Sequence, residues 1–353
     1  MSQTLTVSAP GRICLFGEHQ DYLGLPVITA AVNLRIRLTG APSSDDKIRL
    51  DLPDIHEYTS FALTYPLRYS AERDYFKSTL NILQREGVTL KNGVEVTVRG
   101  TIPINSGTSS SSALVIAWTA FLLKMLNDPR ADDPMTVAAL AHRAEVVEFS
   151  EPGGRMDHFA SAFGGLLFIE FKEGQTPQPL PAKLGAFVLG DSREPKDTTA
   201  ILARVKGGTL DALKLLGKNI HDLTLDDLDA GAARLSGEQY RLLRAQLTNR
   251  YLTRVAQTML RSEPFNHEQF GYLLFKHYEQ LRDGLKISTP KIDRMINAAM
   301  EAGALGAKIN GSGGGGCMFA YAPDKTCEVA EAIAREGGRA YIIRVDDGVR
   351  FED

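Results

Sequence analysis

A run of glycines near the C-terminus restricts the possible folds of this chain more than any other feature. Five of the six residues from Gly311 to Gly316 are glycine, and apolar, strand-like segments flank the run on both sides. Such a run allows repeated positive φ angles and a very close approach of the backbone to a ligand. It contains the pattern G-x-G-x-x-G, but the following CMFAY predicts a strand, whereas a dinucleotide fingerprint must open a helix. We therefore exclude a Rossmann site, and a flexible hairpin linker stays open as the alternative.

A second loop of small residues lies in the first half of the chain, directly before an apolar helix. Gly107, Thr108 and four consecutive serines, Ser109 to Ser112, precede the segment ALVIAWTAFLLKML. The N-terminus of a helix presents unpaired N–H groups and the positive end of the helix dipole, so it favours phosphate. Serine oxygens there are suitable ligands for Mg²⁺. The alternative is a capped helix start without a ligand. The Walker pattern is absent, which excludes a P-loop NTPase.

Two carboxylates flank a tight Pro-Gly-Gly turn. Asp157 follows the turn, and Glu145 lies twelve residues earlier on the preceding predicted helix. Beside a phosphate loop, such a pair can hold a metal ion and accept a proton; the alternative is that Asp157 caps a helix. His19, His142 and His158 are not spaced as pairs of metal ligands. The chain also lacks H-E-x-x-H and G-x-S-x-G, so neither a zinc protease nor a serine hydrolase is indicated.

Length, charge and cysteine content narrow the class of protein further. A chain of 353 residues is long for one hydrophobic core, so we expect two lobes. A net charge of −3 gives no indication that the chain binds nucleic acid or an anionic membrane. Cys14, Cys317 and Cys327 form neither a disulfide framework nor a metal motif, which favours a cytoplasmic protein. The N-terminus lacks the pattern of an export signal, and no window approaches the ~18 apolar residues of a membrane span.

The order of the predicted elements indicates an α+β fold. Strand-forming segments dominate the first hundred residues, and we expect strands at 4–9, 12–16, 27–32, 34–40, 47–52 and 93–100. Helical spacing predicts helices at 75–87 and 132–149, the second with Pro134 at its first position after an aspartate cap. A strand at 166–171 is followed by a largely helical second half, with long periodic runs at 239–260 and 270–285. A helix, a strand, the glycine loop (Gly311 to Gly316) and a further strand complete the chain. This order differs from regular βαβ alternation.

Three stretches, in this order, resemble the motifs of the GHMP kinases: SAPGRICLFGEHQDYLG, IPINSGTSSSSA and KINGSGGGGCMF. That family includes galactokinase, homoserine kinase, mevalonate kinase and phosphomevalonate kinase, and the motifs span residue 8 to about residue 321. The resemblance implies an α+β, two-lobed GHMP kinase fold. An N-terminal ATP-binding lobe, 1–183, would be like domain 2 of ribosomal protein S5, and 184–353 would form an α/β C-terminal lobe. It also implies a phosphotransferase with an alcohol group as acceptor and a substrate cleft between the lobes.

Within the family, four features are most similar to galactokinase-like sugar kinases. They are GEHQDYLG, GGRMDHFASAFGG, the spacing between Glu145 and Asp157, and HYEQLRDGLKISTPKID. The resemblance implies that Asp157 is the catalytic aspartate beside the anomeric hydroxyl of a monosaccharide. Arg12 would keep it ionised, because a neighbouring arginine lowers the pKa of a carboxylate. Four further residues would contact the sugar: Glu18, His19, Asp21 and Gly154.

The resemblance also implies which residues bind the cofactors. The first loop would wrap the phosphates of ATP with Gly107, Thr108, Ser109, Ser110, Ser111 and Ser112. Gly313 and Gly314 would close the site from the glycine loop, while Ser111 and Glu145 would ligate Mg²⁺. Phosphoryl transfer needs mainly positioning and charge neutralisation, which this set supplies. The expected partners are a monosaccharide and ATP, without nucleic acid or membrane, and we expect a monomer or weak homodimer.

Departures from the galactokinase pattern leave other functions open. The short stretch before the first motif, the LFGEH segment and LGDSREPKDT look more like mevalonate kinase, and Cys14 and His158 replace residues usual in galactokinases. One alternative is mevalonate-kinase-type phosphorylation of an isoprenoid precursor, against which Asp21 argues, because mevalonate carries a carboxylate. Another is a non-catalytic sugar- and ATP-binding regulator. The serine loop, Gly107 to Ser112, argues against it, because such a regulator often loses residues there. Besides D-galactose, a galacto-configured relative such as L-arabinose or a uronic acid is a candidate acceptor.

Overall fold

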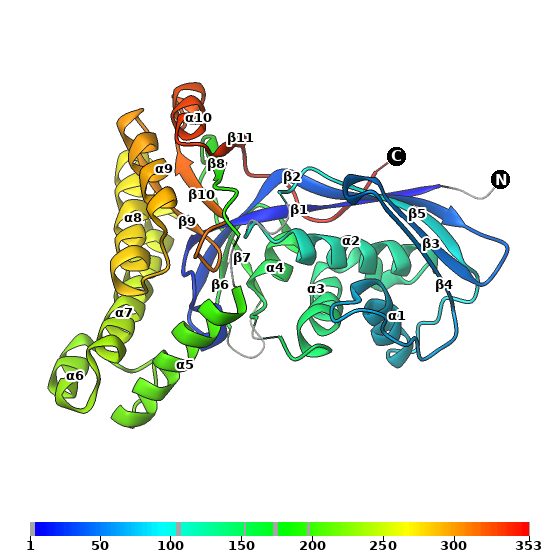
Figure 1. The fold of residues 1–353 in the computed structure, drawn as a ribbon, viewed down its shortest axis with the longest axis horizontal. Coiled ribbons are helices and arrows are strands. Elements are labelled where there is room, and N and C mark those ends of the chain that lie inside the picture. Colours follow the sequence, from blue (N-terminus) through cyan, green and yellow to red (C-terminus); the bar gives the residue numbers. More distant parts are fainter. Residues whose placement is uncertain (1–3, 104–106, 152, 172–175, 196–197, 353) are drawn as a thin grey trace.

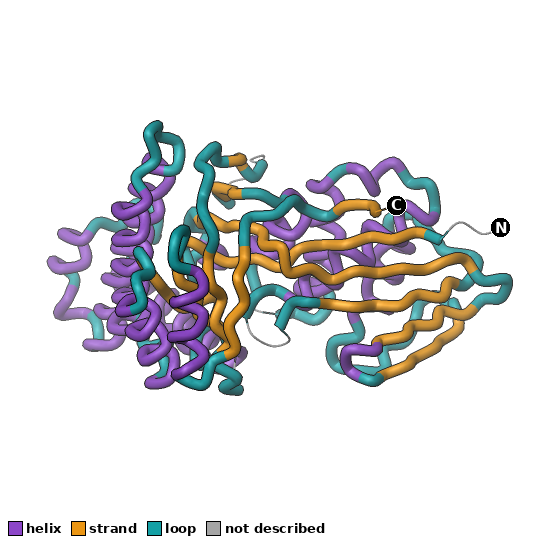
Figure 2. The backbone as a smooth tube through the Cα atoms, turned by 90° about the horizontal axis from the view of Figure 1, so that it is seen from above, coloured by secondary structure: helices purple, strands orange, loops and turns teal. Residues whose placement is uncertain are grey.

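The computed structural model describes residues 4–103, 107–151, 153–171, 176–195 and 198–352 (Figure 1). Two sheets lie side by side, each covered by helices: an eight-stranded sheet and a four-stranded sheet. The helices that cover the first sheet come from the first half of the chain, and those that cover the second come from the second half (Figures 1 and 2). The predicted α+β organisation is therefore confirmed.

The first sheet is built mainly from the N-terminal third of the chain. Its order is β12-β1-β2-β5-β3-β4, with β6 paired to β2 and β7 paired to β6. The pairing of β3 with β5 is parallel. Its strands are β1 (Leu5–Phe16), β2 (Val27–Pro42), β3 (Lys47–Leu52), β4 (Glu57–Ala62), β5 (Val94–Gly100), β6 (Leu166–Ile169), β7 (Gln178–Pro179) and β12 (Arg350–Glu352).

Strands β1 and β2 are each one continuous strand, so the prediction of four short strands between residues 4 and 40 was wrong in its boundaries. The register of the β1–β2 pair shifts between Pro10 and Gly11, and an irregularity of this kind lets pairing continue past a proline. The shift places Gly11 against the carbonyl of Thr108, where an added Cβ would lie 2.8 Å from the oxygen. The strand therefore approaches the serine loop as closely as a glycine backbone allows.

Four helices cover one face of the first sheet: α1 (Tyr75–Arg85), α2 (Ser110–Met125), α3 (Pro134–His142) and α4 (Met156–Phe163). Helix α2 is the central one, and Trp118 and Phe121 on it are buried and stacked 5.6 Å apart. Asp133 caps α3 by accepting hydrogen bonds from the amides of Met135 and Thr136, and Pro134 is the first helical residue, as predicted. The predicted helix at 132–149 ends early, because a π-helical segment, Arg143–Val147, follows α3.

The second sheet has the order β11-β8-β10-β9 and is antiparallel throughout. Its strands are β8 (Phe187–Asp191), β9 (Gly306–Asn310), β10 (Cys317–Tyr321) and β11 (Arg339–Ile343). The surrounding helices are α5 (Thr198–Leu216), α6 (Leu225–Ala230), α7 (Gly237–Met259), α8 (His267–Glu279), α9 (Pro290–Glu301) and α10 (Thr326–Arg335). The glycine loop joins β9 to β10 directly, which confirms the predicted strand–loop–strand order.

The proposed boundary between lobes at residue 184 stays a prediction. β8 is the first strand of the second sheet, but β12 near the C-terminus returns to the first sheet and pairs with β1. β12 therefore lies after the predicted boundary in the sequence but belongs to the first sheet. In the described residues no helix is long and apolar enough to cross a membrane.

Candidate active site

A cavity of about 570 Å³ lies where the two lobes meet, and both contribute to its lining. The first lobe supplies the end of β1, the serine loop and the start of α4, while the second supplies the start of α5 and part of the glycine loop. The predicted site residues that line it are Arg12, Glu18, His19, Asp21, Gly107, Ser109, Ser110, Ser111, Ser112, Glu145, Gly154 and Asp157. Most of the predicted set is therefore brought together, although it is spread over 145 positions of the sequence.

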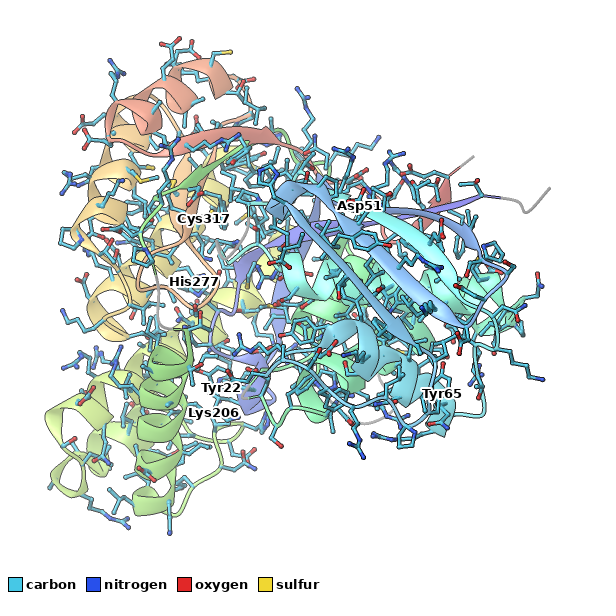
Figure 3. The ribbon with its side chains drawn as sticks, turned by 45° about the vertical axis from the view of Figure 1, so that its right-hand side comes forward. Tyr22, Asp51, Tyr65, Lys206, His277 and Cys317 are labelled. Atoms are coloured by element: carbon cyan, nitrogen blue, oxygen red, sulfur yellow. The ribbon has the colours of Figure 1, made fainter. Side chains whose placement is uncertain are left out.

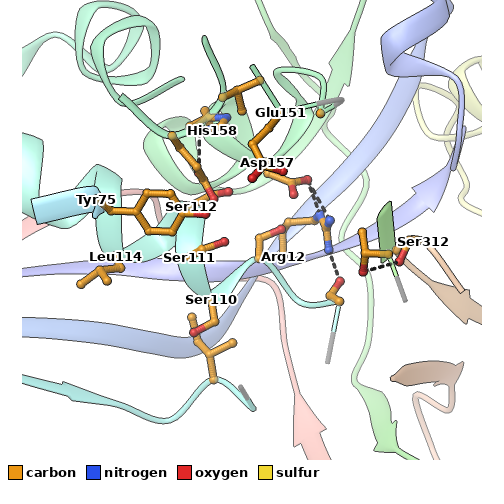
Figure 4. Close-up of a pocket in the computed structure, with 18 of the residues that line it drawn as sticks. Arg12, Tyr75, Ser110, Ser111, Ser112, Leu114, Glu151, Asp157, His158 and Ser312 are labelled. Atoms are coloured by element: carbon orange, nitrogen blue, oxygen red, sulfur yellow. Dashed lines mark hydrogen bonds and ion pairs between the residues drawn. The ribbon is translucent and has the colours of Figure 1, made fainter. Parts of the chain in front are cut away.

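Arg12 and Asp157 form the ion pair at the centre of this cavity (Figure 4). Nε and Nη2 of Arg12 each lie 2.8 Å from Oδ1 of Asp157. The Arg12 side chain is 5% exposed and that of Asp157 is 30% exposed, so the carboxylate faces the cavity and the guanidinium lies behind it. Arg12 also donates to the carbonyl of Gly107, which ties this pair to the serine loop.

The surroundings of Asp157 keep its carboxylate ionised. Burial raises its pKa, but the charge and hydrogen bonds of Arg12 outweigh burial, so the pKa lies below its ordinary value. Ser109 adds a further hydrogen bond in the same direction. At neutral pH Asp157 is therefore an ionised carboxylate. Arg12 binds one of its oxygens, and its side chain is partly exposed to the cavity.

Asp21 carries the opposite shift. Burial first, and then the charge of Asp157, raise the pKa of Asp21 to about 6. Gly154 lies directly against it, because an added Cβ at Gly154 would be 2.0 Å from Oδ2 of Asp21. The missing side chain of Gly154 thus leaves room for the second carboxylate in the cavity beside the first.

His19 connects the loop after β1 to the glycine loop. Its Nδ1 lies 2.9 Å from the hydroxyl of Tyr22, and its Nε2 lies 3.0 Å from the carbonyl oxygen of Ser312. The ring of Tyr22 lines the cavity, and Nζ of Lys206 on α5 lies 5.4 Å from the ring centre (Figure 3). Tyr22 was in the predicted motif but was not predicted as a site residue, since a sequence does not show which way a loop tyrosine points.

Glu18 lines the cavity but is already engaged by the protein. One oxygen accepts a hydrogen bond from Nζ of Lys308 on β9, and the other accepts one from the amide of Gly311 at 3.1 Å. The structure thus places Glu18 at the base of the glycine loop, with two partners from the second sheet.

The serine loop leads into α2 through a residue in the left-handed region. Ser109 has φ of 61° and precedes the first residue of the helix, Ser110. Thr108 is buried and does not line the cavity; its carbonyl accepts a hydrogen bond from the amide of Arg12 at 3.2 Å. The helix start therefore faces the cavity with the N–H groups and hydroxyls expected of an anion site.

Glu145 lies in the π-helical segment that follows α3. Its Oε2 is 2.8 Å from Nε2 of His158, the residue after Asp157. Burial raises the pKa of Glu145. The charge and hydrogen bond of His158, with hydrogen bonds from Ser111 and Ser112, lower it by more, so the net shift is downward. A π-helical turn adds one residue to the helix and re-aims the side chains after it, which here brings an ionised carboxylate to the serine loop.

Besides Thr108, the predicted phosphate-binding residues Gly313 and Gly314 do not line the cavity. An added Cβ on Gly313 would lie 2.5 Å from the carbonyl oxygen of Ile287, and one on Gly314 would lie 2.2 Å from Cδ1 of Ile201. Both have positive φ, as the glycine run predicted. The part of the loop that faces the cavity is instead Gly311 and Ser312.

An apolar part of the cavity extends beyond the serine loop toward the first sheet. It was not predicted, because its residues come from separate elements with no motif in common. They are Ile36, Leu52, Ile55, Tyr75, Phe76, Val98, Ile102 and Leu114. The described residues form no cluster of three or more histidine, cysteine or acidic side chains suited to a metal ion, so a metal here would need hydroxyl or phosphate oxygens as well.

Three sequence models match this chain. The model of the GHMP kinases N terminal domain matches 74–165, that of the GHMP kinases C terminal domain matches 260–342, and the galactokinase galactose-binding signature matches 2–42. Together these matches cover more than half of the chain. The chain belongs to the GHMP kinases. The matches confirm the predicted two-lobed fold. Galactokinase and mevalonate kinase, both members of this family, use ATP to phosphorylate alcohol groups, so the predicted phosphotransferase class is confirmed too.

The relatives of this GHMP kinase include mevalonate kinases and galactokinases. It is 28% identical over 98% of both chains to the mevalonate kinase of Thermococcus sibiricus. It is 26% identical to the galactokinase of Actinobacillus succinogenes, over 94% of this chain and 89% of the relative. Its structure superposes on that of Lactococcus lactis galactokinase complexed with galactose with a TM-score of 0.87, at 22% identity, covering 99% of this chain and 95% of the other. The fold is therefore that of the family, and the acceptor must be argued from the cavity.

Proposed function

We propose that this GHMP kinase transfers the γ-phosphoryl group of ATP to the anomeric hydroxyl of a monosaccharide, galactose or a galacto-configured relative. The observation that carries the proposal is the pair of carboxylates, Asp157 and Asp21, in one cavity beside the serine loop. The galactose-binding signature spans Arg12 and Asp21, which supports the same acceptor class. Paired carboxylates suit hydroxyl groups, which donate hydrogen bonds to them.

In the proposed reaction the acceptor oxygen attacks the γ-phosphorus, and the bond from that phosphorus to the ADP oxygen breaks. Asp157 orients the hydroxyl and takes its proton, while Arg12 keeps the carboxylate ionised before the transfer. Asp21, His19 and Gly154 surround the acceptor, and Gly107 with Ser109 to Ser112 surround the phosphates. The apolar part of the cavity, with Tyr75 and Leu114, is suited to the adenine ring.

Ser111 and Glu145 would hold Mg²⁺, which fits because both offer the oxygen atoms that this ion prefers. When bound, the ion neutralises charge on the β- and γ-phosphates. The protein side of this arrangement is the hydrogen bond from Ser111 to Glu145, with His158 on the far side of the carboxylate. These contacts hold the carboxylate beside the start of α2.

A second candidate is mevalonate kinase activity, which the identity to mevalonate kinases over nearly the full length favours. Mevalonate carries a carboxylate, and the two aspartates of the cavity would repel it. We therefore rank it below the sugar.

A panel of acceptors tests the proposal by ADP release: D-galactose, L-arabinose, D-galacturonate, N-acetylgalactosamine, D-glucose and mevalonate. We expect turnover with one or more of D-galactose, L-arabinose and N-acetylgalactosamine, little with D-glucose, and less with D-galacturonate, whose carboxylate the two aspartates would also repel. Turnover with mevalonate alone would contradict the proposed acceptor class and leave the family assignment unchanged.

A further inference from the structure

Glu18 lies where the first sheet meets the glycine loop, and each oxygen of its carboxylate has a protein partner. Oε2 accepts a hydrogen bond from Nζ of Lys308, and Oε1 accepts one from the amide of Gly311 at 3.1 Å. The ion pair is buried, with 1% of the Glu18 side chain and none of Lys308 exposed. The carboxylate therefore bridges a buried cation and the first amide of the glycine loop.

Lys308 belongs to the second sheet, but its ammonium group reaches the first. It lies on β9, donates a second hydrogen bond to the carbonyl of Cys14 on β1 at 2.7 Å, and lies 5.0 Å from the ring centre of Phe319. Burying two charges has a large desolvation cost, which is tolerated only when the geometry of the pair is well satisfied. This pair joins the end of β1 to the strand that leads into the glycine loop.

His277 is a further ionisable group next to this pair, and it does not supply the positive charge. Its Nδ1 lies 4.0 Å from Oε2 of Glu18, and its ring stacks on Phe16. Burial, and then the charge of Lys308, hold the pKa of His277 well below its ordinary value. Lys308 is therefore the cation that compensates Glu18.

The glycine loop has little freedom at this point. Gly311 has φ of 79°, and an added Cβ there would lie 2.9 Å from the carbonyl oxygen of Gly107 in the serine loop. Asn310 donates a hydrogen bond to the same carbonyl at 2.9 Å. The two loops are thus in contact at Gly311, and the Glu18 carboxylate is what holds the amide of that residue.

We propose that Glu18 is a positioning residue for the phosphate side of the cavity: with Lys308, it holds the amide of Gly311 and sets the glycine loop against the serine loop, and it does not bind the acceptor. This assignment rests on the proposed function, because it takes these two loops to enclose the phosphates of ATP. It separates Glu18 from Asp157, because the side chain of Asp157 is 30% exposed toward the cavity and that of Glu18 is 1% exposed.

Two double variants test the assignment with the charges balanced in both. Glu18→Gln/Lys308→Met removes the ion pair but keeps an oxygen that can accept from the Gly311 amide. Glu18→Leu/Lys308→Met removes the ion pair and that acceptor. We measure MgATP binding by calorimetry without any acceptor, and then the acceptor KM by ADP release.

For the Leu/Met variant we expect MgATP binding to weaken about tenfold, the effect of one lost hydrogen bond to a loop amide. The acceptor KM should stay within about threefold of the wild type, and the Gln/Met variant should bind MgATP nearly as the wild type does. A higher acceptor KM with unchanged MgATP binding in the Leu/Met variant would overturn the assignment. Equal weakening of MgATP binding in both variants would overturn it too.

Rescue within one pair gives a second measurement that does not depend on the leucine variant folding. Lys308→Met alone leaves a buried carboxylate without its cation, so it should weaken MgATP binding, and Glu18→Gln in the same chain should restore it. Failure to restore binding would contradict the assignment. Arg35→Ala, which breaks an ion pair away from the cavity, is the control for general destabilisation. A wild-type chain that binds MgATP but phosphorylates no sugar would reject the proposed acceptor and leave this test intact.

Discussion

At the scale of single residues, the site contains two aspartates whose pKa values are moved in opposite directions. Arg12 lowers the pKa of Asp157, while burial and the charge of Asp157 raise that of Asp21 to about 6. Neighbouring carboxylates with pKa values moved apart in this way are suited to different roles. Asp157 stays ionised, whereas Asp21 titrates at mildly acid pH. The proposed base is the first of the two.

Replacing Asp157 with asparagine should remove the proton acceptor and leave the shape of the site almost unchanged. We expect kcat to fall by roughly 10²–10⁴-fold, the usual contribution of a general base, with much smaller changes in the KM values. The measurement is ADP release with the best acceptor of the panel. Wild-type turnover by Asp157→Asn would contradict the role proposed for this residue.

Asp21 should make the stability of the fold depend on pH. Its folded-state pKa of about 6 exceeds the ordinary value of 3.8, so the folded state keeps a proton that the unfolded state has already lost. This contribution to stability is present at low pH and is lost as the pH rises through about 6. Asp21→Asn, which cannot ionise, should therefore raise the free energy of unfolding at pH 7.5 by about 3 kcal/mol, with the gain vanishing near pH 4.

Thermal unfolding of both proteins between pH 4 and pH 8 measures this difference. Parallel curves for the wild type and Asp21→Asn would show that Asp21 does not titrate in this range. The variant should also have a higher acceptor KM, because it presents an amide where a carboxylate faces the acceptor.

Gly154 should be intolerant of even one added methyl group. A Cβ there would lie 2.0 Å from Oδ2 of Asp21, so Gly154→Ala must displace that side chain or the turn. We expect the acceptor KM to rise at least tenfold, by about the free energy of one hydrogen bond to a charged group. Gly153→Ala is the matched control, because its nearest neighbour would be a side-chain carbon of Val146 at 3.6 Å. Equal effects of the two substitutions would contradict the explanation.

At the scale of elements, the start of α2 and the π-helical segment after α3 together form the proposed phosphate side of the cavity. The helix start offers amides and hydroxyls, and the irregular turn at Arg143–Val147 brings Glu145 to Ser111. A regular α-helix through this segment would rotate Glu145 away by about one residue position. The local irregularity is thus part of the site.

Glu145→Gln should weaken the Mg²⁺ binding that we propose for this segment. We expect the Mg²⁺ concentration for half-maximal ADP release to rise about tenfold, since the amide keeps an oxygen but lacks the charge. Glu148→Gln is the control: it lies just beyond the same segment and pairs with Arg85 at the surface. An unchanged Mg²⁺ dependence of Glu145→Gln would contradict its assignment as a ligand.

At the scale of the whole molecule, the C-terminal segment returns to the first sheet and fastens the two ends of the chain. Arg35 on β2 donates to the carboxylate of Asp346 at 2.8 Å, to the backbone of Asp347 and Gly348, and to Ser8 on β1. These bonds lie away from the cavity. They hold β12 beside β1 and so support the strand that carries Arg12.

Arg35→Ala should therefore affect stability and not specificity. We expect the free energy of unfolding to fall by about 2 kcal/mol, since several partly buried acceptors lose their donor. Both KM values should stay close to those of the wild type. Chemical denaturation and steady-state kinetics measure the two effects, and a large change in the acceptor KM would show that the strand ends influence the cavity.

Much of the candidate site could be predicted because its chemistry is concentrated in three short motifs. Arg12 and Asp157 were expected to meet, and they do so at 2.8 Å. The positive φ angles of the glycine run and the cap of α3 were also predicted, because they depend on backbone preferences of a few adjacent residues. The division of β1 and β2 into short strands was wrong, since pairing with a neighbour overrides a local interruption.

The sequence by itself determined the family, the fold class, the serine and glycine loops and the two aspartates. Only the tertiary structure decided that Glu18 pairs with Lys308, 290 positions away, and that Gly311 and Ser312 face the cavity in place of Gly313 and Gly314. Only packing assembled the apolar part of the cavity from separate elements. The physical reason is the same in each case: backbone preferences act within a few residues, whereas the pairing of buried charges and side chains depends on which distant segments the sheets bring together.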